Sequence, residues 1–330
     1  MTLKNLSLPR ILVTGAGGDS AIGVIKALRK ASNSYVIYAV CIDKNSVGLK
    51  MADCQAIVPP VSDVSEYVSS LIELINRESI NIFIPTIDSE MIIISEFQNR
   101  FNEETKCKII IGKYSDMLMC SNKQATSEYL DSIEINQPRM ILGEERVRLA
   151  LHDGLDIIAK PRFGGGSKGI HFLSVDDLAV DGWFNNSFIY QEFERYSKEI
   201  TSVVLKDDNK IVGCAVFERV LSNGRTVWCK RIPEHDYSDL LTDIARGLDI
   251  PYINLQFGIT TCGRVSVFDI NPRFSGSTSV FARVLNGPEL LVEKYLTGSM
   301  PEFTPSTHFF ESARYYDDWI YNERRVLGPI

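Results

Sequence analysis

The segment from residue 254 to residue 273 constrains the fold of this chain more than any other. Two apolar-rich runs flank Thr261-Cys262-Gly263-Arg264, which predicts a β-hairpin closed by a tight turn with glycine where φ is positive. Because strand side chains alternate between two faces, pairing Thr261 with Arg264 assigns both strands to faces. The polar face then carries Asn254, Gln256, Asp269 and Asn271. The apolar face, expected to enter a core, carries Leu255, Phe257, Phe268 and Ile270.

The polar face of this hairpin is rich in side-chain oxygen atoms. Mg²⁺ prefers one or two carboxylates together with waters and phosphate oxygens, so Asp269 and its amide neighbours suit that cation. Arg273 follows Asn271 by two residues and can hold a phosphate through two hydrogen bonds. The same pattern is also typical of an amphipathic hairpin whose polar face is solvated. The hairpin alone leaves both interpretations open.

Composition argues against several other classes of protein. The 330 residues are 45% hydrophobic, enough for a large core and more than one domain. The net charge of −7 and the absence of a long basic run argue against extended nucleic-acid binding. Seven scattered cysteines predict reduced thiols and a cytoplasmic protein, and no apolar run is long enough to span a bilayer. Four histidines that do not cluster argue against a histidine-based zinc site.

Strands and helices alternate over residues 10–110, as in a Rossmann-like, doubly wound α/β domain with a mostly parallel sheet. The expected strands lie at 10–14, 35–42, 80–85 and 107–111, and the expected helices at 20–30, 65–78 and 90–100. After residue 154 the pattern changes to strands separated by glycine turns, which predicts an α+β part dominated by antiparallel strands.

A glycine-rich turn joins two predicted strands in the middle of the chain. The strand 155–160 ends in Lys160, and the turn that follows contains Gly164, Gly165, Gly166 and Ser167. Such a turn can lay backbone N–H groups over phosphates while Lys160 reaches a phosphate from the strand. It is not a Walker A loop, because the Gly-x-x-x-x-Gly-Lys-Ser/Thr pattern is absent and no helix follows. A mobile surface turn is the alternative.

A second glycine-rich loop, Gly15 to Gly23, follows the first strand and opens a helix, a context that suits anion binding. The dinucleotide-binding pattern Gly-x-Gly-x-x-Gly requires glycine where Ser20 stands, although Asp43 ends the second strand as a ribose-binding acid would. NAD(P) binding is therefore the less favoured interpretation. Asp88 and Glu90 follow the third strand, either at a ligand-binding edge of the sheet or as an acidic first helical turn.

Taken in order, these motifs resemble the ATP-grasp superfamily, and especially its carbamoyl phosphate synthetase-like branch. The resemblance rests on Ser121-Asn122-Lys123, Ala159-Lys160-Pro161 with its glycine-rich turn, Gln191-Glu192-Phe193-Glu194, and the hairpin with its ending, residues 269–276. That ending, Asp-Ile-Asn-Pro-Arg-Phe-Ser-Gly, is similar to the family's Glu-Ile-Asn-Pro-Arg-Phe-Gly-Gly. The resemblance implies a Rossmann-like pre-ATP-grasp domain at 1–113, then an ATP-grasp fold with a small subdomain at 114–190 and a C-terminal subdomain at 191–330.

The resemblance also implies roles for individual residues. Those expected to bind the phosphates of ATP are Lys123, Lys160, Gly164, Gly165, Gly166 and Ser167. Those expected around the adenosine are Gln191, Glu192 and Phe193 for adenine, and Glu199 for ribose. Those expected to ligate Mg²⁺, with Mn²⁺ as an alternative, are Gln256, Asp269 and Asn271. Those expected to act in catalysis are Arg273, Lys160 and Asp269.

The implied activity is ATP-dependent ligation of a small carboxylate to an amine or another nucleophile through an acyl phosphate. The resemblance is compatible with a homodimer and implies neither a nucleic-acid nor a membrane partner. Asp269 stands where the family more often has Glu, and Ser275 where it often has Gly. The chain also holds one such unit, which argues against carbamoyl phosphate synthesis by this chain alone. The alternatives are an NAD(P)-dependent Rossmann oxidoreductase and a non-catalytic ATP-binding subunit of a carbamoyl phosphate synthetase-like complex.

Overall fold

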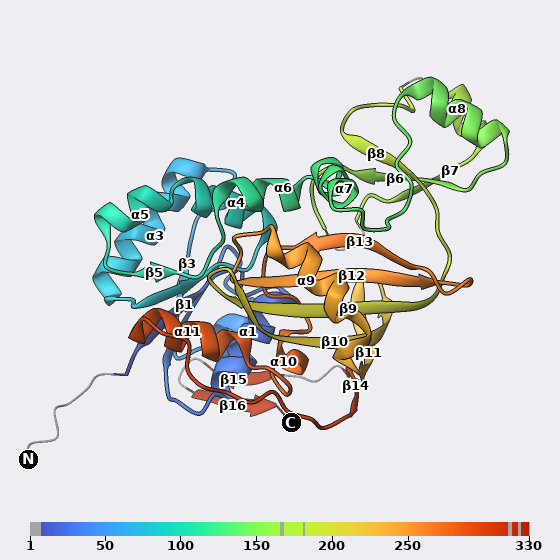
Figure 1. Ribbon diagram of the computed structural model, residues 1–330. Coiled ribbons are helices and arrows are strands. Elements are labelled where there is room, and N and C mark those ends of the chain that lie inside the picture. Colours follow the sequence, from blue (N-terminus) through green and yellow to red (C-terminus); the bar gives the residue numbers. More distant parts are fainter. Residues whose placement is uncertain (1–7, 166–167, 181, 316–318, 323–324, 330) are drawn as a thin grey trace, which may run out of the picture.

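The computed structural model describes residues 8–165, 168–180, 182–315, 319–322 and 325–329. Its first part is a five-stranded parallel sheet in the order β3-β2-β1-β4-β5 (Figure 1). The strands are β1 Arg10–Val13, β2 Val36–Cys41, β3 Cys54–Ile57, β4 Ile82–Ile84 and β5 Lys108–Ile109. The predicted doubly wound α/β domain is confirmed, with β3 in addition to the expected strands.

Helices cover both faces of this sheet, because its central strands are apolar on both sides. Leu12 and Phe83 share one apolar cluster with helices of one face, and Ile11 and Ile82 share another with helices of the opposite face. The first group is α3 Val64–Glu78, α4 Asp88–Glu96 and α5 Gln98–Glu104. The second group is α1 Asp19–Arg29, α2 Val47–Met51 and the C-terminal α11 Gly287–Thr297.

The middle of the chain forms a small layer that projects from the body of the molecule (Figure 1). Its sheet has three antiparallel strands in the order β7-β6-β8 and packs against α8 around an apolar cluster of its own. The strands are β6 Ile157–Pro161, β7 His171–Leu173 and β8 Phe188–Glu192. Helix α8 Glu144–His152 belongs to this layer, whereas α6 Tyr114–Ser121 and α7 Lys123–Ser132 pack on the body of the molecule. Neither α6 nor α8 was among the sequence-based expectations.

The C-terminal part is built on a six-stranded sheet in the order β13-β12-β9-β10-β11-β14, whose pairs are all antiparallel. The strands are β9 Tyr196–Asp207, β10 Lys210–Ser222, β11 Arg225–Ile232, β12 Tyr252–Thr260, β13 Val265–Asn271 and β14 Glu311–Ala313. Helices α9 Ser238–Arg246 and α10 Thr278–Phe281 accompany it, and β15 Trp319–Asn322 pairs with β16 Arg325–Pro329. The predicted antiparallel α+β part is confirmed.

The hairpin β12–β13 has the predicted register where its polar residues lie. Asn254 pairs with Asn271 and Gln256 with Asp269, but the register then shifts so that Phe257 pairs with Val267. The shift is a β-bulge, which inserts one extra residue into one strand. The expectation that Phe268 enters the core is therefore wrong, because Val267 takes the fully buried position instead. Leu255, Phe257 and Ile270 are buried, as expected.

The turn of this hairpin is one residue longer than expected. The backbone N–H of Thr260 donates to the carbonyl of Arg264 at 2.9 Å, so the closing pair is Thr260–Arg264 rather than Thr261–Arg264. Gly263 has a φ of +85°, which explains the glycine at this position. The extra turn residue compensates for the one consumed by the bulge.

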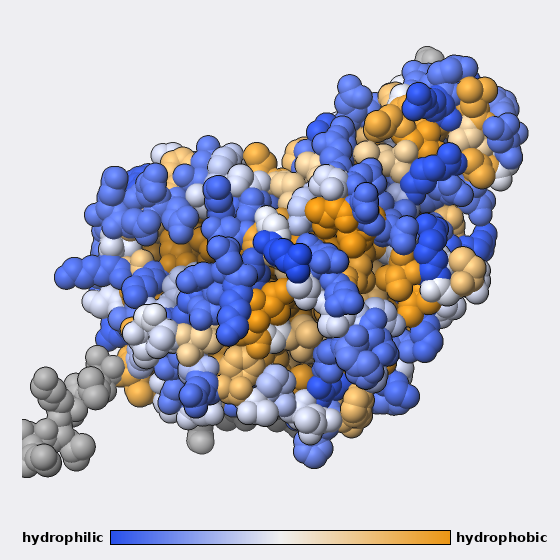
Figure 2. Space-filling view, viewed as in Figure 1, coloured by the Kyte–Doolittle hydropathy of each residue, from blue (hydrophilic) through white to orange (hydrophobic). Residues whose placement is uncertain are grey.

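Polar and charged side chains cover most of the face shown in Figure 2, with apolar residues visible between them. Among the residues that the structure describes, no helix is long and apolar enough to cross a membrane.

Candidate active site

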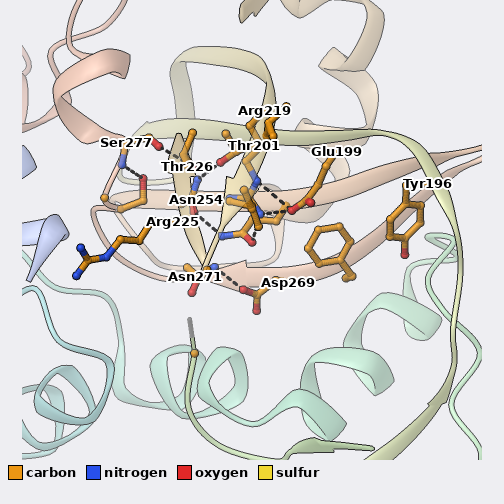
Figure 3. Close-up of a pocket in the computed structure, with 18 of the residues that line it drawn as sticks. Tyr196, Glu199, Thr201, Arg219, Arg225, Thr226, Asn254, Asp269, Asn271 and Ser277 are labelled. Atoms are coloured by element: carbon orange, nitrogen blue, oxygen red, sulfur yellow. Dashed lines mark hydrogen bonds and ion pairs between the residues drawn. The ribbon is translucent and has the colours of Figure 1, made fainter. Parts of the chain in front are cut away.

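A cavity of about 890 Å³ lies between the small three-stranded sheet and the large six-stranded sheet. Its volume is within the range of small-molecule binding sites, about 300–1,000 Å³. The small sheet contributes Lys160 from β6 and Glu192 from β8, and the large sheet contributes Gln256 and Asp269 from the predicted hairpin. Figure 3 shows the strand side chains pointing into this space.

Most of the residues predicted from the sequence meet at this cavity. Those that line it are Lys123, Lys160, Gly165, Glu192, Phe193, Glu199, Gln256, Asp269, Asn271 and Arg273. Gln191 is buried and lines a very small neighbouring void instead. Gly164 lines a separate cavity of about 130 Å³. Gly166 and Ser167 lie outside the described residues.

Two lysines face the hairpin from the other side of the cavity. Lys123 begins α7, whose N-cap Asn122 accepts a hydrogen bond from the backbone of Gln124 at 3.2 Å. The ammonium group of Lys123 donates to the carbonyl of Gly164, which ties α7 to the glycine-rich turn. Burial lowers the pKa of Lys160 to about 8, an effect that the carboxylate of Asp269 opposes and the charge of Lys123 increases. Both cations are placed to meet an anionic ligand.

The polar face of the hairpin is held by hydrogen bonds within the hairpin and to the neighbouring strands β9 and β10 (Figure 3). The side-chain N–H of Asn271 donates to Asp269 Oδ2 at 2.8 Å. Asn254 is fully buried and donates to Thr201 Oγ1 at 3.0 Å, so it supports the face from below. Gln256 Oε1 accepts from Arg219 Nη2 at 2.7 Å.

Arg219 is a residue that the sequence did not single out. Its guanidinium is almost buried and is held by Glu199, with Nε to Oε1 at 3.0 Å. Glu199 lines the cavity and is also the ion-pair partner of Arg219, with Gln256 as the third member of the group; its expected contact with a ribose stays a prediction. Arg219 lies within the apolar stretch of β10, and a charged residue in such a stretch was the available signal.

The hairpin suits a magnesium ion that is shared with phosphate oxygens. Within the described residues, no group of three or more His, Cys, Asp or Glu side chains could hold a metal ion. Asp269 supplies one carboxylate and Asn271 one amide oxygen, and Mg²⁺ typically takes one or two carboxylates and completes its shell with waters and phosphates. The Oε1 atom of Gln256 already accepts a hydrogen bond from Arg219. The donor set fits a phosphate-bound cation better than an all-protein cage.

The strand β8 leads into the segment expected to pair with adenine. The N–H groups of Glu192 and Phe193 already donate to the carbonyls of Arg139 and Asp156, at 3.0 and 2.7 Å. A base bound here would have to use other backbone groups of this segment. Phe268, turned out of the core by the bulge, stacks on Tyr196 with 5.6 Å between ring centroids and lines the same end of the cavity. These two rings offer an apolar wall for a base.

Comparison with known proteins supports the fold. Residues 11–110 match the family model described as the PylC-like N-terminal domain, and no curated protein matches the sequence significantly. N5-carboxyaminoimidazole synthetase from Staphylococcus aureus complexed with ADP superposes with a TM-score of 0.70 at 16% identity, over 90% of this chain and 79% of that chain. The biotin carboxylase–β,γ-ATP complex from Campylobacter jejuni gives a TM-score of 0.67 at 14% identity, over 89% and 72%.

A third similar structure is the biotin carboxylase domain dimer of Hydrogenobacter thermophilus 2-oxoglutarate carboxylase, in complex with MgADP, ADP and bicarbonate. Its TM-score is 0.66 at 16% identity, over 90% of this chain and 71% of that chain. This protein has the ATP-grasp fold. The fold inferred from the motifs is confirmed, whereas the carbamoyl phosphate synthetase-like branch stays a prediction.

In this ATP-grasp fold, other residues of the protein fill the space beside the N-terminal glycine-rich loop. A Cβ atom on Gly15 would lie 2.6 Å from a side-chain carbon of Ile87, and one on Gly48 would lie 2.2 Å from the carbonyl oxygen of Ala16. Asp43 is exposed and accepts a hydrogen bond from the backbone of Asn45 at 2.9 Å, within a turn. The glycines pack elements together, and none of Gly15, Gly17, Gly18 and Asp43 lines the cavity. This arrangement argues against the NAD(P) interpretation.

Proposed function

We propose that the protein is an ATP-dependent ligase that joins a small carboxylate to an amine or another nucleophile. The observation that carries the proposal is the meeting of Lys123 and Lys160 with Asp269, Asn271 and Arg273 around one cavity. The two lysines on one side and the side-chain oxygens of the hairpin on the other suit a nucleoside triphosphate with a divalent cation. Two of the similar structures are complexes with ADP and one is a β,γ-ATP complex, which supports this choice of ligand.

The residues of the chain would act mainly by positioning and by neutralising charge. Attack of the substrate carboxylate on the terminal phosphorus of ATP gives an acyl phosphate and ADP, and attack of the nucleophile then releases phosphate. Lys160, Lys123 and Arg273 would hold the negative charge that moves during transfer. A magnesium ion held by Asp269 and Asn271 would neutralise phosphate charge. The glycine-rich turn, which already contacts Lys123 through Gly164, would exclude water.

Thermal-shift titrations test the choice of nucleotide. We expect Mg-ATP to stabilise the protein and NADPH to leave it unchanged, because a ligand at about 100 times its dissociation constant adds about 2.7 kcal/mol. Lys160→Ala should lose most of this stabilisation. Lys210→Ala, at the exposed start of β10, is the matched control and should keep it. Stabilisation by NADPH with no response to ATP would contradict the proposal.

Turnover separates a ligase from a non-catalytic ATP-binding subunit. The second possibility has one observation in its favour, because Asp269 is the single carboxylate at the hairpin and Gln256 is bound to Arg219. ADP release should be measured across a panel of amino acids and small carboxylates. A ligase releases ADP faster with a particular carboxylate and amine, whereas a non-catalytic subunit binds ATP without turnover on any of them.

A further inference from the structure

The cavity continues beyond Asn271 to an end that carries an excess of positive charge. Arg225, Arg314 and Asp19 line it, and we call these three residues the arginine end. Arg314 Nη1 lies 3.1 Å and Arg225 Nε 3.5 Å from the same oxygen, Asp19 Oδ2. Figure 3 shows Arg225 at the end opposite Tyr196, with Asn271 and Asp269 between them.

Three separate elements build the arginine end. Arg225 begins β11 directly after the tight turn at Asn223 and Gly224, both of which have positive φ. Arg314 follows β14, its backbone N–H donates to the carbonyl of Val227 at 2.8 Å, and its side chain also donates to the carbonyl of Gly276. Asp19 is the first residue of α1. The guanidinium groups therefore converge from distant parts of the chain.

Charge compensation differs among the arginines that line the cavity. Arg273 is paired with Asp88, and Arg219 with Glu199, so each of these cations has its own carboxylate. Two arginines share Asp19, which leaves one net positive charge. The exposed side-chain fractions of Arg225, Arg314 and Asp19 are 57%, 32% and 29%, so a ligand in the cavity can reach all three.

We propose that the arginine end binds an anionic group, a carboxylate or a phosphate, on the substrate of the ligase, away from the carboxylate that reacts. This inference rests on the proposed function, which places the nucleotide phosphates near Asp269 and Asn271 and the substrate beyond them. Guanidinium groups bind carboxylates and phosphates through paired hydrogen bonds. In the free protein Asp19 satisfies both arginines, and the substrate anion displaces it.

Simple anions test this inference directly. Acetate and inorganic phosphate are titrated into the protein saturated with Mg²⁺ and β,γ-methylene-ATP, and their dissociation constants are measured by thermal shift. We expect at least one of them to bind, and Arg225→Gln and Arg314→Gln to weaken it at least tenfold. Arg246→Gln, an exposed arginine on α9, is the matched control and should bind like the wild type. Binding of acetate alone indicates a carboxylate on the substrate, and binding of phosphate alone indicates a phosphate.

The Asp19→Asn variant distinguishes an anion-binding site from a purely structural ion pair. It removes the internal competitor, so the anion should bind more tightly than to the wild type. The inference is overturned if neither anion binds, if the arginine variants bind them normally, or if Asp19→Asn weakens binding. Nucleotide affinity measured on the same samples keeps the two hypotheses apart. If the wild-type protein does not bind ATP, the proposed function is contradicted. If it binds ATP but neither anion, only the proposed role of the arginine end is contradicted.

Discussion

Arg273 and Asp88, 185 residues apart in the chain, form a two-point ion pair at the edge of the cavity. Arg273 Nη2 donates to Asp88 Oδ2 at 2.9 Å, and Nε donates to Oδ1. Asp88 is the first residue of α4, which follows the parallel strand β4 after a short connection, whereas Arg273 follows the hairpin strand β13. A Cβ on Gly165 would lie 3.3 Å from Asp88 Oδ2, so the glycine-rich turn also reaches this point. The N-terminal domain thus orients an arginine of the C-terminal part.

Replacing Asp88 by Asn should separate positioning of Arg273 from nucleotide binding. The variant keeps the shape of the side chain but removes the charge that fixes the guanidinium. We expect kcat for ADP release to fall at least tenfold while KM for ATP changes less than threefold. The stability loss should be modest, about 1–3 kcal/mol in urea unfolding. Asp236→Asn, an exposed carboxylate of a short 3-10 helix, is the control, and an unchanged kcat in Asp88→Asn would show that the ion pair is only structural.

Asp269→Asn tests the hairpin as a metal site. The amide has nearly the same shape, so the fold should survive, but the site loses its one carboxylate. We expect ADP release to fall by about two orders of magnitude and the dependence on Mg²⁺ concentration to shift to higher values, because metal neutralises phosphoryl charge during transfer. The measurement is a Mg²⁺ titration of initial rates. A variant with the wild-type rate and the wild-type Mg²⁺ dependence would show that Asp269 is not a metal ligand.

Two phenylalanines of the same hairpin should respond in opposite ways because of the β-bulge. Phe257 is fully buried, and Phe257→Ala should destabilise the protein by about 3–5 kcal/mol. Phe268 faces the cavity and stacks on Tyr196, so Phe268→Ala should cost much less stability and weaken nucleotide binding instead. Urea unfolding and ADP titration of both variants give the comparison. A large loss of stability in Phe268→Ala would show that Phe268 contributes to the core after all.

The local sequence pattern was sufficient to predict much of the hairpin and the position of Lys160 at the cavity. The alternation of Asn254, Gln256, Asp269 and Asn271 correctly placed the paired positions, because one face of the strand pair must meet the core. Lys160 at the end of a strand also lies where its sequence context indicated. The bulge was not predictable, since one extra residue leaves no mark on composition.

Long-range pairing explains what the sequence could not reveal. Arg314 meets Asp19 from 295 residues away, and Arg219 meets Glu199 through the pairing of β10 with β9. The partners of these arginines depend on which strands become neighbours, and the local sequence does not show that, although the apolar context of Arg219 in β10 marks it as unusual. For the same reason the ion pair of Glu199 with Arg219 could not be read from the sequence, and the ribose role of Glu199 stays a prediction.

Glu90 should make the stability of the protein depend on pH. Its carboxyl is fully buried, accepts a hydrogen bond from Thr14, and burial raises its pKa to about 8 from an ordinary value of 4.5. The folded state therefore keeps a proton that the unfolded state loses, and stability falls as pH rises from 4.5 to 8, by up to about 1.4 kcal/mol per pH unit. Glu90→Gln lacks this titration, so its stability relative to the wild type should increase over that window. Urea unfolding at several pH values measures it, and parallel curves would contradict the raised pKa.

Lys160 should make nucleotide affinity depend on pH in a range where an ordinary lysine would not. Burial lowers its pKa to about 8, so the free protein loses this positive charge at higher pH, while an unperturbed lysine stays charged. Binding of ADP without added metal then requires uptake of a proton, and affinity should fall by up to tenfold per pH unit above 8. Lys160→Arg keeps its charge and should show a flat profile between pH 7.5 and about 9.5. Calorimetric titrations in two buffers of different ionisation enthalpy would report the proton directly, and equal pH profiles for wild type and Lys160→Arg would exclude Lys160 as the titrating group.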